Sequence, residues 1–199
     1  MENKEPIRII KNLCVFCGSS NGNDEIYRNS VVTLAQTMAM RHINLVYGGG
    51  GRGLMGAMAA TLQHTPVTVT GIIPTRLFDM VKHIEHNEDE LVIVSDMHER
   101  KATMYNRSDA FVALPGGIGT LEEVMEALTW LQLGYHNKPV GLLNIAGYYD
   151  KLLDFLRASV TAGFLQPALL EALIVTSDPN VLLDNLATVS LTLPLKIEE

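Results

Sequence analysis

A strand, a glycine turn and a helix follow one another in Ala110-Phe-Val-Ala-Leu-Pro-Gly-Gly-Ile-Gly-Thr-Leu-Glu-Glu123. The run Ala110–Leu114 is apolar on both faces, which is typical of a strand in a parallel sheet covered by helices. From Thr120 onward, apolar residues recur with a helical period as far as Leu133. This order of elements indicates one unit of an α/β sheet.

The same alternation runs through the rest of the chain. Short apolar runs predict strands at Leu13–Cys17, Asn44–Tyr47, Val67–Ile73, Leu91–Val94, Ala110–Leu114, Val140–Leu143 and Leu173–Thr176. Helical patterns lie between them, at Asp24–Met40, Leu54–His64, Met97–Arg107, Thr120–Leu133, Tyr148–Ala162 and Asn180–Thr188. We therefore expect one α/β domain over residues 1–199, a doubly wound, Rossmann-like parallel sheet with helices on both faces.

Two helix starts carry their own signals. Ser95 or Asp96 can cap the helix that begins at Met97. Asp178 can cap the last helix, with Pro179 in its first position.

Composition and charge exclude several classes of protein. The 199 residues are 47% hydrophobic and carry a formal charge of -7, which argues against duplex nucleic acid as the partner. No apolar run approaches the length that spans a bilayer, and the charged residues 1–6 do not begin a secretory signal. The two cysteines, Cys14 and Cys17, lie in a predicted strand and are interpreted as small buried residues. We expect a cytoplasmic protein with no nucleic-acid or membrane partner.

Three glycine-rich turns each follow a predicted strand and precede a predicted helix. They are Cys17-Gly-Ser-Ser20, Tyr47-Gly-Gly-Gly-Gly-Arg-Gly-Leu-Met-Gly56 and Pro115-Gly-Gly-Ile-Gly-Thr120. Because the strands run in one direction, all three turns should lie at one edge of the sheet. Glycine lets backbone N–H groups approach an anion, and a helix N-terminus adds free donors. Together the turns predict a phosphate or nucleotide site, with Ser19, Ser20 and Thr120 as hydroxyl donors.

The second turn has an alternative interpretation. Gly51-Arg-Gly-Leu-Met-Gly56 matches the dinucleotide fingerprint, but Gly71-Ile-Ile-Pro-Thr-Arg76 lacks the acid that should hold the ribose. Tight packing of helix against strand would explain the same glycines. The six histidines show no zinc-type spacing.

Four charged residues stand near these turns. Glu122 and Glu123 fall in the first turn of the predicted helix, where carboxylates favour the helix dipole, yet Glu123 can also face a ligand's sugar. Arg100 and Lys101 fall in the first turn of the preceding predicted helix, where cations oppose the helix dipole. Either they are solvated, or they hold an anion or a catalytic carboxylate.

At these residues the chain resembles a known family. Met97-His-Glu-Arg-Lys101 followed by Leu114-Pro-Gly-Gly-Ile-Gly-Thr-Leu-Glu-Glu123 is similar to the LOG ("lonely guy") family of cytokinin riboside 5'-monophosphate phosphoribohydrolases, whose members have also been called lysine decarboxylases. The similarity extends from about Leu13 to Phe164, and Pro-Gly-Gly-x-Gly-Thr-x-x-Glu is its most specific motif.

The resemblance implies hydrolysis of the N-glycosidic bond of a purine nucleoside 5'-monophosphate to free base and ribose 5-phosphate. It implies Arg100 and Glu123 as the catalytic pair, without a metal or redox cofactor. The substrate-binding residues expected from the turns and the resemblance are Gly18, Ser19, Gly49, Gly50, Lys101, Gly116, Gly117, Ile118, Gly119, Thr120, Leu121, Glu122 and Thr129. It also implies at least a homodimer.

One segment departs from the family pattern. The family has an acid after Gly-x-Ile-Pro, whereas residues 75–90 place Lys82 near that position, with Glu85 as a substitute. The base therefore stays open between adenine and N6-substituted adenine. Two other functions remain, a broad-specificity nucleotide nucleosidase and a non-catalytic nucleotide sensor or carrier on the same fold. A decarboxylase would need a pyridoxal-linked lysine, and nothing marks Lys101 or Lys82 as one.

Overall fold

The computed structural model describes residues 7–84, 87–191 and 193. Its centre is a parallel sheet in the order β4-β3-β2-β1-β5-β6-β7. The strands are β1 (Asn12–Phe16), β2 (Asn44–Tyr47), β3 (Val69–Pro74), β4 (Glu90–Val94), β5 (Ala110–Ala113), β6 (Val140–Leu143) and β7 (Ile174–Thr176). Each predicted strand is present, and the parallel α/β sheet is confirmed.

The helices match the predicted patterns with two additions. They are α1 (Glu25–Met40), α2 (Gly53–Leu62), α3 (Thr75–Val81), α4 (Met97–Arg107), α5 (Ile118–Gln132), α6 (Asp150–Thr161), α7 (Pro167–Ala172) and α8 (Pro179–Thr188), with a 3₁₀ turn η1 (Ile145–Gly147). The two helices that were not predicted are α3 and α7, which have 7 and 6 residues. Helices this short do not show a periodic pattern, because the pattern needs a longer window.

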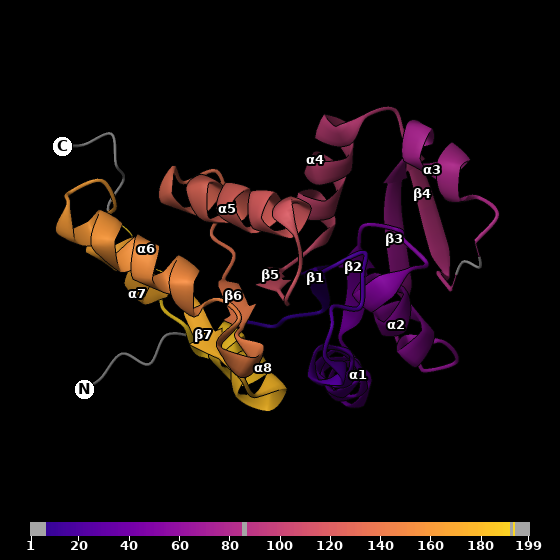
Figure 1. Cartoon of the computed structure of the whole chain (residues 1–199), viewed down its shortest axis with the longest axis horizontal. Helices are drawn as coiled ribbons and strands as arrows, with labels where there is room; N and C mark the ends of the chain where they lie inside the picture. The colour runs from indigo at the N-terminus through magenta and orange to yellow at the C-terminus, as the bar shows by residue number, and fades with distance from the viewer. Residues whose placement is uncertain (1–6, 85–86, 192, 194–199) are drawn as a thin grey trace.

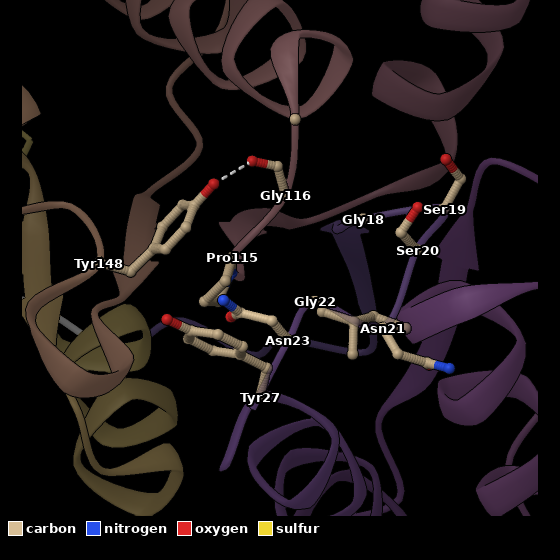
Figure 2. Close-up of a pocket in the computed structure, with 12 residues that line it drawn as sticks. Gly18, Ser19, Ser20, Asn21, Gly22, Asn23, Tyr27, Pro115, Gly116 and Tyr148 are labelled. Carbon is tan, nitrogen blue, oxygen red and sulfur yellow. Dashed lines mark hydrogen bonds between the residues drawn. The ribbon is translucent and has the colours of Figure 1, made fainter. Parts of the chain in front are cut away.

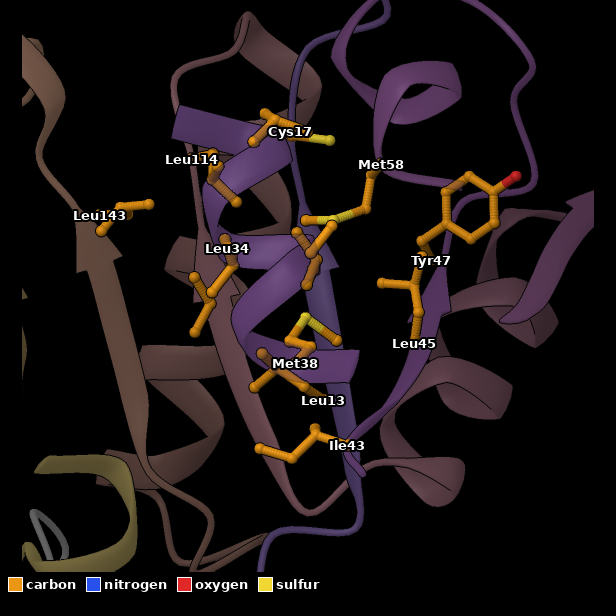
Figure 3. Close-up of a cluster of buried hydrophobic side chains, with 14 of the residues drawn as sticks. Leu13, Cys17, Leu34, Met38, Ile43, Leu45, Tyr47, Met58, Leu114 and Leu143 are labelled. Atoms are coloured by element: carbon orange, nitrogen blue, oxygen red, sulfur yellow. The ribbon is translucent and has the colours of Figure 1, made fainter. Parts of the chain in front are cut away.

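Helices cover both faces of the sheet, as predicted (Figure 1). Alternate side chains of each strand point to opposite faces, so Leu13 packs in the cluster under α1, α2 and α8. Its neighbour Cys14 packs in the cluster under α4, α5, α6 and α7. Figure 3 shows Leu34 and Met38 of α1 among the strand side chains of the first cluster.

Both cysteines are buried and unbridged. Burial raises the pKa of each thiol above its ordinary value, so both stay protonated. The interpretation of Cys14 and Cys17 as small core residues is confirmed.

The predicted caps are present. The Asp96 carboxylate accepts hydrogen bonds from the backbone N–H groups of His98 and Glu99 at the start of α4. Asp178 caps α8 in the same way, and Pro179 opens that helix. In the described ranges, no helix is both long and apolar enough to cross a membrane.

The strand order places the switch point of the sheet beside β1. The chain moves outward from β1 to β4 on one side and then returns to β5, which pairs with the other side of β1. Ligands in open α/β sheets bind beyond the carboxyl ends of the strands where the order reverses. Here the turns after β1 and β5 flank that position.

Candidate active site

The three glycine turns meet at the switch point. The Gly18 N–H donates to the Pro115 carbonyl at 3.1 Å, which joins the first turn to the third. The Leu54 N–H donates to the Gly18 carbonyl at 3.0 Å, which joins the second turn to the first. The expectation that all three turns share one edge of the sheet is confirmed.

A pocket of about 310 Å³ opens between the first and third turns (Figure 2). Its wall combines both turns with the start of α1 and the turn before α6. The lining residues are Gly18, Ser19, Ser20, Asn21, Gly22, Asn23, Tyr27, Leu54, Pro115, Gly116, Gly117 and Tyr148. Four predicted substrate-binding residues, Gly18, Ser19, Gly116 and Gly117, thus lie in one pocket wall.

The glycines of the second turn serve packing. A Cβ at Gly56 would lie 2.3 Å from the Gly51 carbonyl oxygen, and one at Gly53 would lie 2.3 Å from the backbone of Ser19. Gly53 also has a φ of 61°, a conformation that favours glycine. The N–H groups that begin α2 donate in part to the Gly18 carbonyl. Close packing therefore accounts for the fingerprint-like spacing.

Gly49 and Gly50 lie outside the pocket wall. Gly49 is buried with a φ of 68°, and a Cβ there would sit 3.2 Å from the Ile72 N–H nitrogen. A Cβ at Gly50 would meet the end of the Met55 side chain at 2.9 Å. Their placement in substrate binding stays a prediction.

The third turn leads into an open helix N-terminus. Gly117 is the N-cap of α5, and no side chain caps this end. Gly117, Ile118 and Gly119 are exposed, and a Cβ at either glycine would meet nothing within 4 Å. The first N–H groups of a helix have no intrahelical acceptor and carry partial positive charge. This end of α5 can therefore accept an anion.

One expectation about α5 is wrong. The helix begins at Ile118 rather than Thr120, so Glu122 and Glu123 lie beyond its first turn. Glycine has a low helix propensity, but Gly119 is nevertheless the second residue of α5. A capping role for either carboxylate is therefore not supported.

Arg100 and Glu123 form a buried ion pair. The Arg100 Nη1 lies 3.0 Å from the Glu123 Oε1, and each side chain is 11% exposed. The Arg100 Nε also donates to the Ile72 carbonyl at 3.1 Å. The sequence left two alternatives for Arg100: a solvated cation, or one that holds an anion or a carboxylate. The structure shows that Arg100 holds the carboxylate of Glu123.

The electrostatics of Glu123 reflect competing causes. Burial raises the pKa of its carboxyl above the ordinary 4.5, while the Arg100 cation acts in the opposite direction. The carboxylate therefore accepts a proton more readily than an exposed glutamate does.

Lys101 faces carboxylates on α5. Its Nζ lies 2.6 Å from Glu122 and 2.9 Å from Glu126. Thr129 lies apart from the turns, since it is exposed near the end of α5 and its hydroxyl donates to the Met125 carbonyl. Thr129 is eleven positions beyond Ile118, or about 16 Å along the helix axis.

Sequence reasoning missed two contributors. A Cβ at Gly48 would lie 2.1 Å from the Arg100 Nη2, so this glycine makes room for the guanidinium. The run of four glycines, Gly48–Gly51, suggested a close approach of another group, but it did not indicate that Gly48 is the glycine that Arg100 approaches. Tyr148 enters the pocket from the turn after β6, and nothing local in the sequence marks it.

Fold and site together define a doubly wound α/β protein with three glycine turns at its switch point and a buried arginine–glutamate pair. Residues 55–186 match the family model described as "Possible lysine decarboxylase". The chain is 51% identical over 159 residues to the cytokinin riboside 5'-monophosphate phosphoribohydrolase LOG5 of Arabidopsis thaliana, covering 79% of this chain and 69% of that relative. It is 47% identical to LOG7 of the same plant, covering 85% and 77%. The chain belongs to this LOG family.

Solved structures share the fold at low identity. The molybdenum cofactor binding protein of Rippkaea orientalis matches with a TM-score of 0.62 at 20% identity, covering 90% of this chain and 93% of that one. The molybdenum cofactor carrier protein of Chlamydomonas reinhardtii matches with a TM-score of 0.60 at 20% identity, covering 85% and 91%. These likenesses support the Rossmann-like architecture.

Proposed function

We propose that this protein hydrolyses the N-glycosidic bond of purine nucleoside 5'-monophosphates, with adenine or an N6-substituted adenine as the base. The products are the free base and ribose 5-phosphate. The observation that carries the proposal is the buried Arg100–Glu123 pair, one to two turns beyond the open N-terminus of α5. The names of relatives about 50% identical, which are phosphoribohydrolases, support the same reaction.

The third turn would hold the 5'-phosphate. Free N–H groups at the start of a helix favour a doubly charged group. Exposed backbone in this turn leaves room for its oxygens, and Thr120 adds a hydroxyl beside Gly116. The residues assigned to this role are Gly116, Gly117, Ile118, Gly119, Thr120 and Leu121. Binding of the remote phosphate positions the sugar for reaction.

Glu123 would act on the sugar carbon. As the bond from C1' to the base nitrogen breaks, its electron pair leaves with the base and positive charge develops on the sugar. A carboxylate at that position stabilises the charge and takes a proton from the attacking water, whose oxygen bonds to C1'. The departing base nitrogen takes up a proton from solvent and leaves as the free base. Arg100 would orient Glu123 and favour its ionised form. Neither step requires a cofactor.

The remaining assignments involve a second copy of the chain. Thr129 lies about 16 Å along α5 from the phosphate turn, too far to touch the same mononucleotide's phosphate end. From there Thr129 can contact the base end of that nucleotide or a ligand in the site of a partner subunit. We propose a homodimer in which it does the latter. Lys101 and Glu122, which pair with each other at 2.6 Å, would lie at the rim of the site.

Base selection is assigned to residues 75–90. Lys82 is exposed and pairs with Asp79 at 3.3 Å. Glu85, the substitute for the family's acid, lies outside the described residues. A pyridoxal-dependent decarboxylase is not favoured, because Lys101 is held by two carboxylates.

A cytoplasmic location is proposed from the state of the two cysteines. Cys14 and Cys17 are both buried free thiols, the form in which cytosolic proteins keep their cysteines.

The decisive experiment measures base release. The protein is incubated with AMP, isopentenyl-AMP, GMP, CMP and adenosine, and released base is identified by chromatography. We expect release from the adenine monophosphates and little from adenosine, because adenosine lacks the anchoring phosphate. Release from GMP and CMP at similar rates would instead favour the broad nucleosidase.

The matched variants are Glu123→Gln and Glu171→Gln. Glu123→Gln should fold and lose about 10²–10⁴-fold in turnover, the usual range for a general base. Glu171→Gln, an exposed carboxylate on α7, should behave as wild type. Unchanged release by Glu123→Gln would refute the catalytic role, and binding of AMP without release by wild type would favour the sensor.

A further inference from the structure

Two successive tyrosines donate to the backbone of the third glycine turn. The Tyr148 hydroxyl donates to the Gly116 carbonyl at 2.5 Å, as the dashed line in Figure 2 marks. The Tyr149 hydroxyl donates to the Leu114 carbonyl at 2.5 Å. Both tyrosines come from the turn between β6 and α6, 32 and 35 residues beyond the carbonyls that they bind.

These bonds fix the orientation of peptide planes. In a trans peptide the C=O of one residue and the N–H of the next point in opposite directions. The Gly116 carbonyl faces Tyr148, so the Gly117 N–H points away from that tyrosine. The Pro115 carbonyl accepts from the Gly18 N–H at 3.1 Å. By the same geometry, the Gly116 N–H points away from Gly18.

The segment that presents the tyrosines is itself held in place. Ala146 has a φ of 50° and Gly147 a φ of 69°, so the chain reverses sharply before Tyr148. A positive φ at a residue other than glycine persists only where its surroundings enforce it. The Asn144 side chain does so in part, since its oxygen accepts from the Tyr149 N–H at 2.7 Å and its nitrogen donates to Asp150 at 2.8 Å.

The two tyrosines differ in how much the fold depends on them. Tyr149 is 2% exposed and lies in the core. Tyr148 is 43% exposed at the rim of the pocket, with its ring edge-on to those of Tyr27 and Tyr149 at 5.8 and 5.1 Å. A change confined to the Tyr148 hydroxyl therefore leaves the packing of the rings intact.

We propose that Tyr148 is a positioning residue for the phosphate turn: its hydrogen bond to Gly116 fixes the Gly117 N–H for contact with the 5'-phosphate. The inference rests on the proposed function and adds to it a residue from outside the glycine motif. Tyr148 acts through the backbone and takes no part in bond cleavage. Its loss should therefore weaken binding of the phosphate and leave the chemical step unchanged.

The test compares Tyr148→Phe with wild type on AMP and on adenosine. We expect KM for AMP to rise roughly 3- to 10-fold, the effect of one neutral hydrogen bond. We expect kcat to change less than about two-fold, and kcat/KM for adenosine to stay unchanged, because adenosine has no phosphate to position. Inhibition by ribose 5-phosphate should weaken by the same factor as KM for AMP. The control is Tyr135→Phe, whose ring packs on Trp130 instead and is 75% exposed.

The outcomes separate the two proposals. An unchanged KM for AMP in Tyr148→Phe, or equal losses on AMP and adenosine, would overturn the positioning role while the hydrolase stands. If wild type releases no base from any monophosphate, the hydrolase fails. Calorimetric binding of ribose 5-phosphate to wild type and Tyr148→Phe then decides the positioning role, and equal affinities overturn it.

Discussion

Replacing Arg100 with methionine should leave Glu123 as a buried charge without a partner. Both side chains are 11% exposed and their charged atoms lie 3.0 Å apart, so water screens the pair only weakly. Removing one partner of such a pair costs about 3–5 kcal/mol, which includes the penalty of the charge left behind. In a chain of this size, each kcal/mol lowers Tm by about 2–4 °C, so Tm should fall by roughly 6–20 °C.

The loss should depend on pH. Burial raises the pKa of Glu123 even with Arg100 present, and without the cation the pKa rises further. A carboxyl with a raised pKa contributes stability fully below its unfolded pKa and loses that contribution as pH rises through its folded pKa. The variant should therefore be closer to wild type at about pH 5 than at about pH 8.

Unfolding in urea at both pH values checks this reasoning. The set comprises wild type, Arg100→Met, Glu123→Gln and the double variant. The double variant should be more stable than Arg100→Met alone, because it removes the unpaired charge together with its partner. A loss below about 1 kcal/mol, or strictly additive losses, would show that the pair behaves like a surface salt bridge and would refute the argument.

Other predictions concern the glycines and a cap. Gly48→Ala places a Cβ 2.1 Å from the Arg100 Nη2, so we expect about 1–3 kcal/mol lower stability and a large loss of base release. Gly119→Ala meets no atom within 4 Å and should raise stability by about 0.5–1 kcal/mol while raising KM for AMP; stability lower than wild type would contradict this. Asp178→Ala removes the cap of α8 and should cost about 1 kcal/mol without changing base release, as thermal unfolding and chromatography can show.

The residue pattern within short stretches of the sequence was enough to predict the positions of most strands and helices. Runs apolar on both faces indicated buried parallel strands, and Asp96 and Asp178 indicated the starts of α4 and α8. Both signals act between residues close in the chain. The start of α5 was misplaced for the same reason, since a glycine at 119 is a poor helix former but does not prevent the helix there.

Patterns along the chain were thus sufficient to predict an α/β fold, three glycine turns at one edge of the sheet and a motif that resembles the LOG family. The pairing of β1 with β5, which brings Gly18 against Pro115 at the switch point, emerged only in the folded chain. The tertiary structure also set Arg100 against Glu123, 23 positions away, and Tyr148 against Gly116. Such contacts depend on strand order and on side-chain reach across the folded chain, and local propensity contains no information about either.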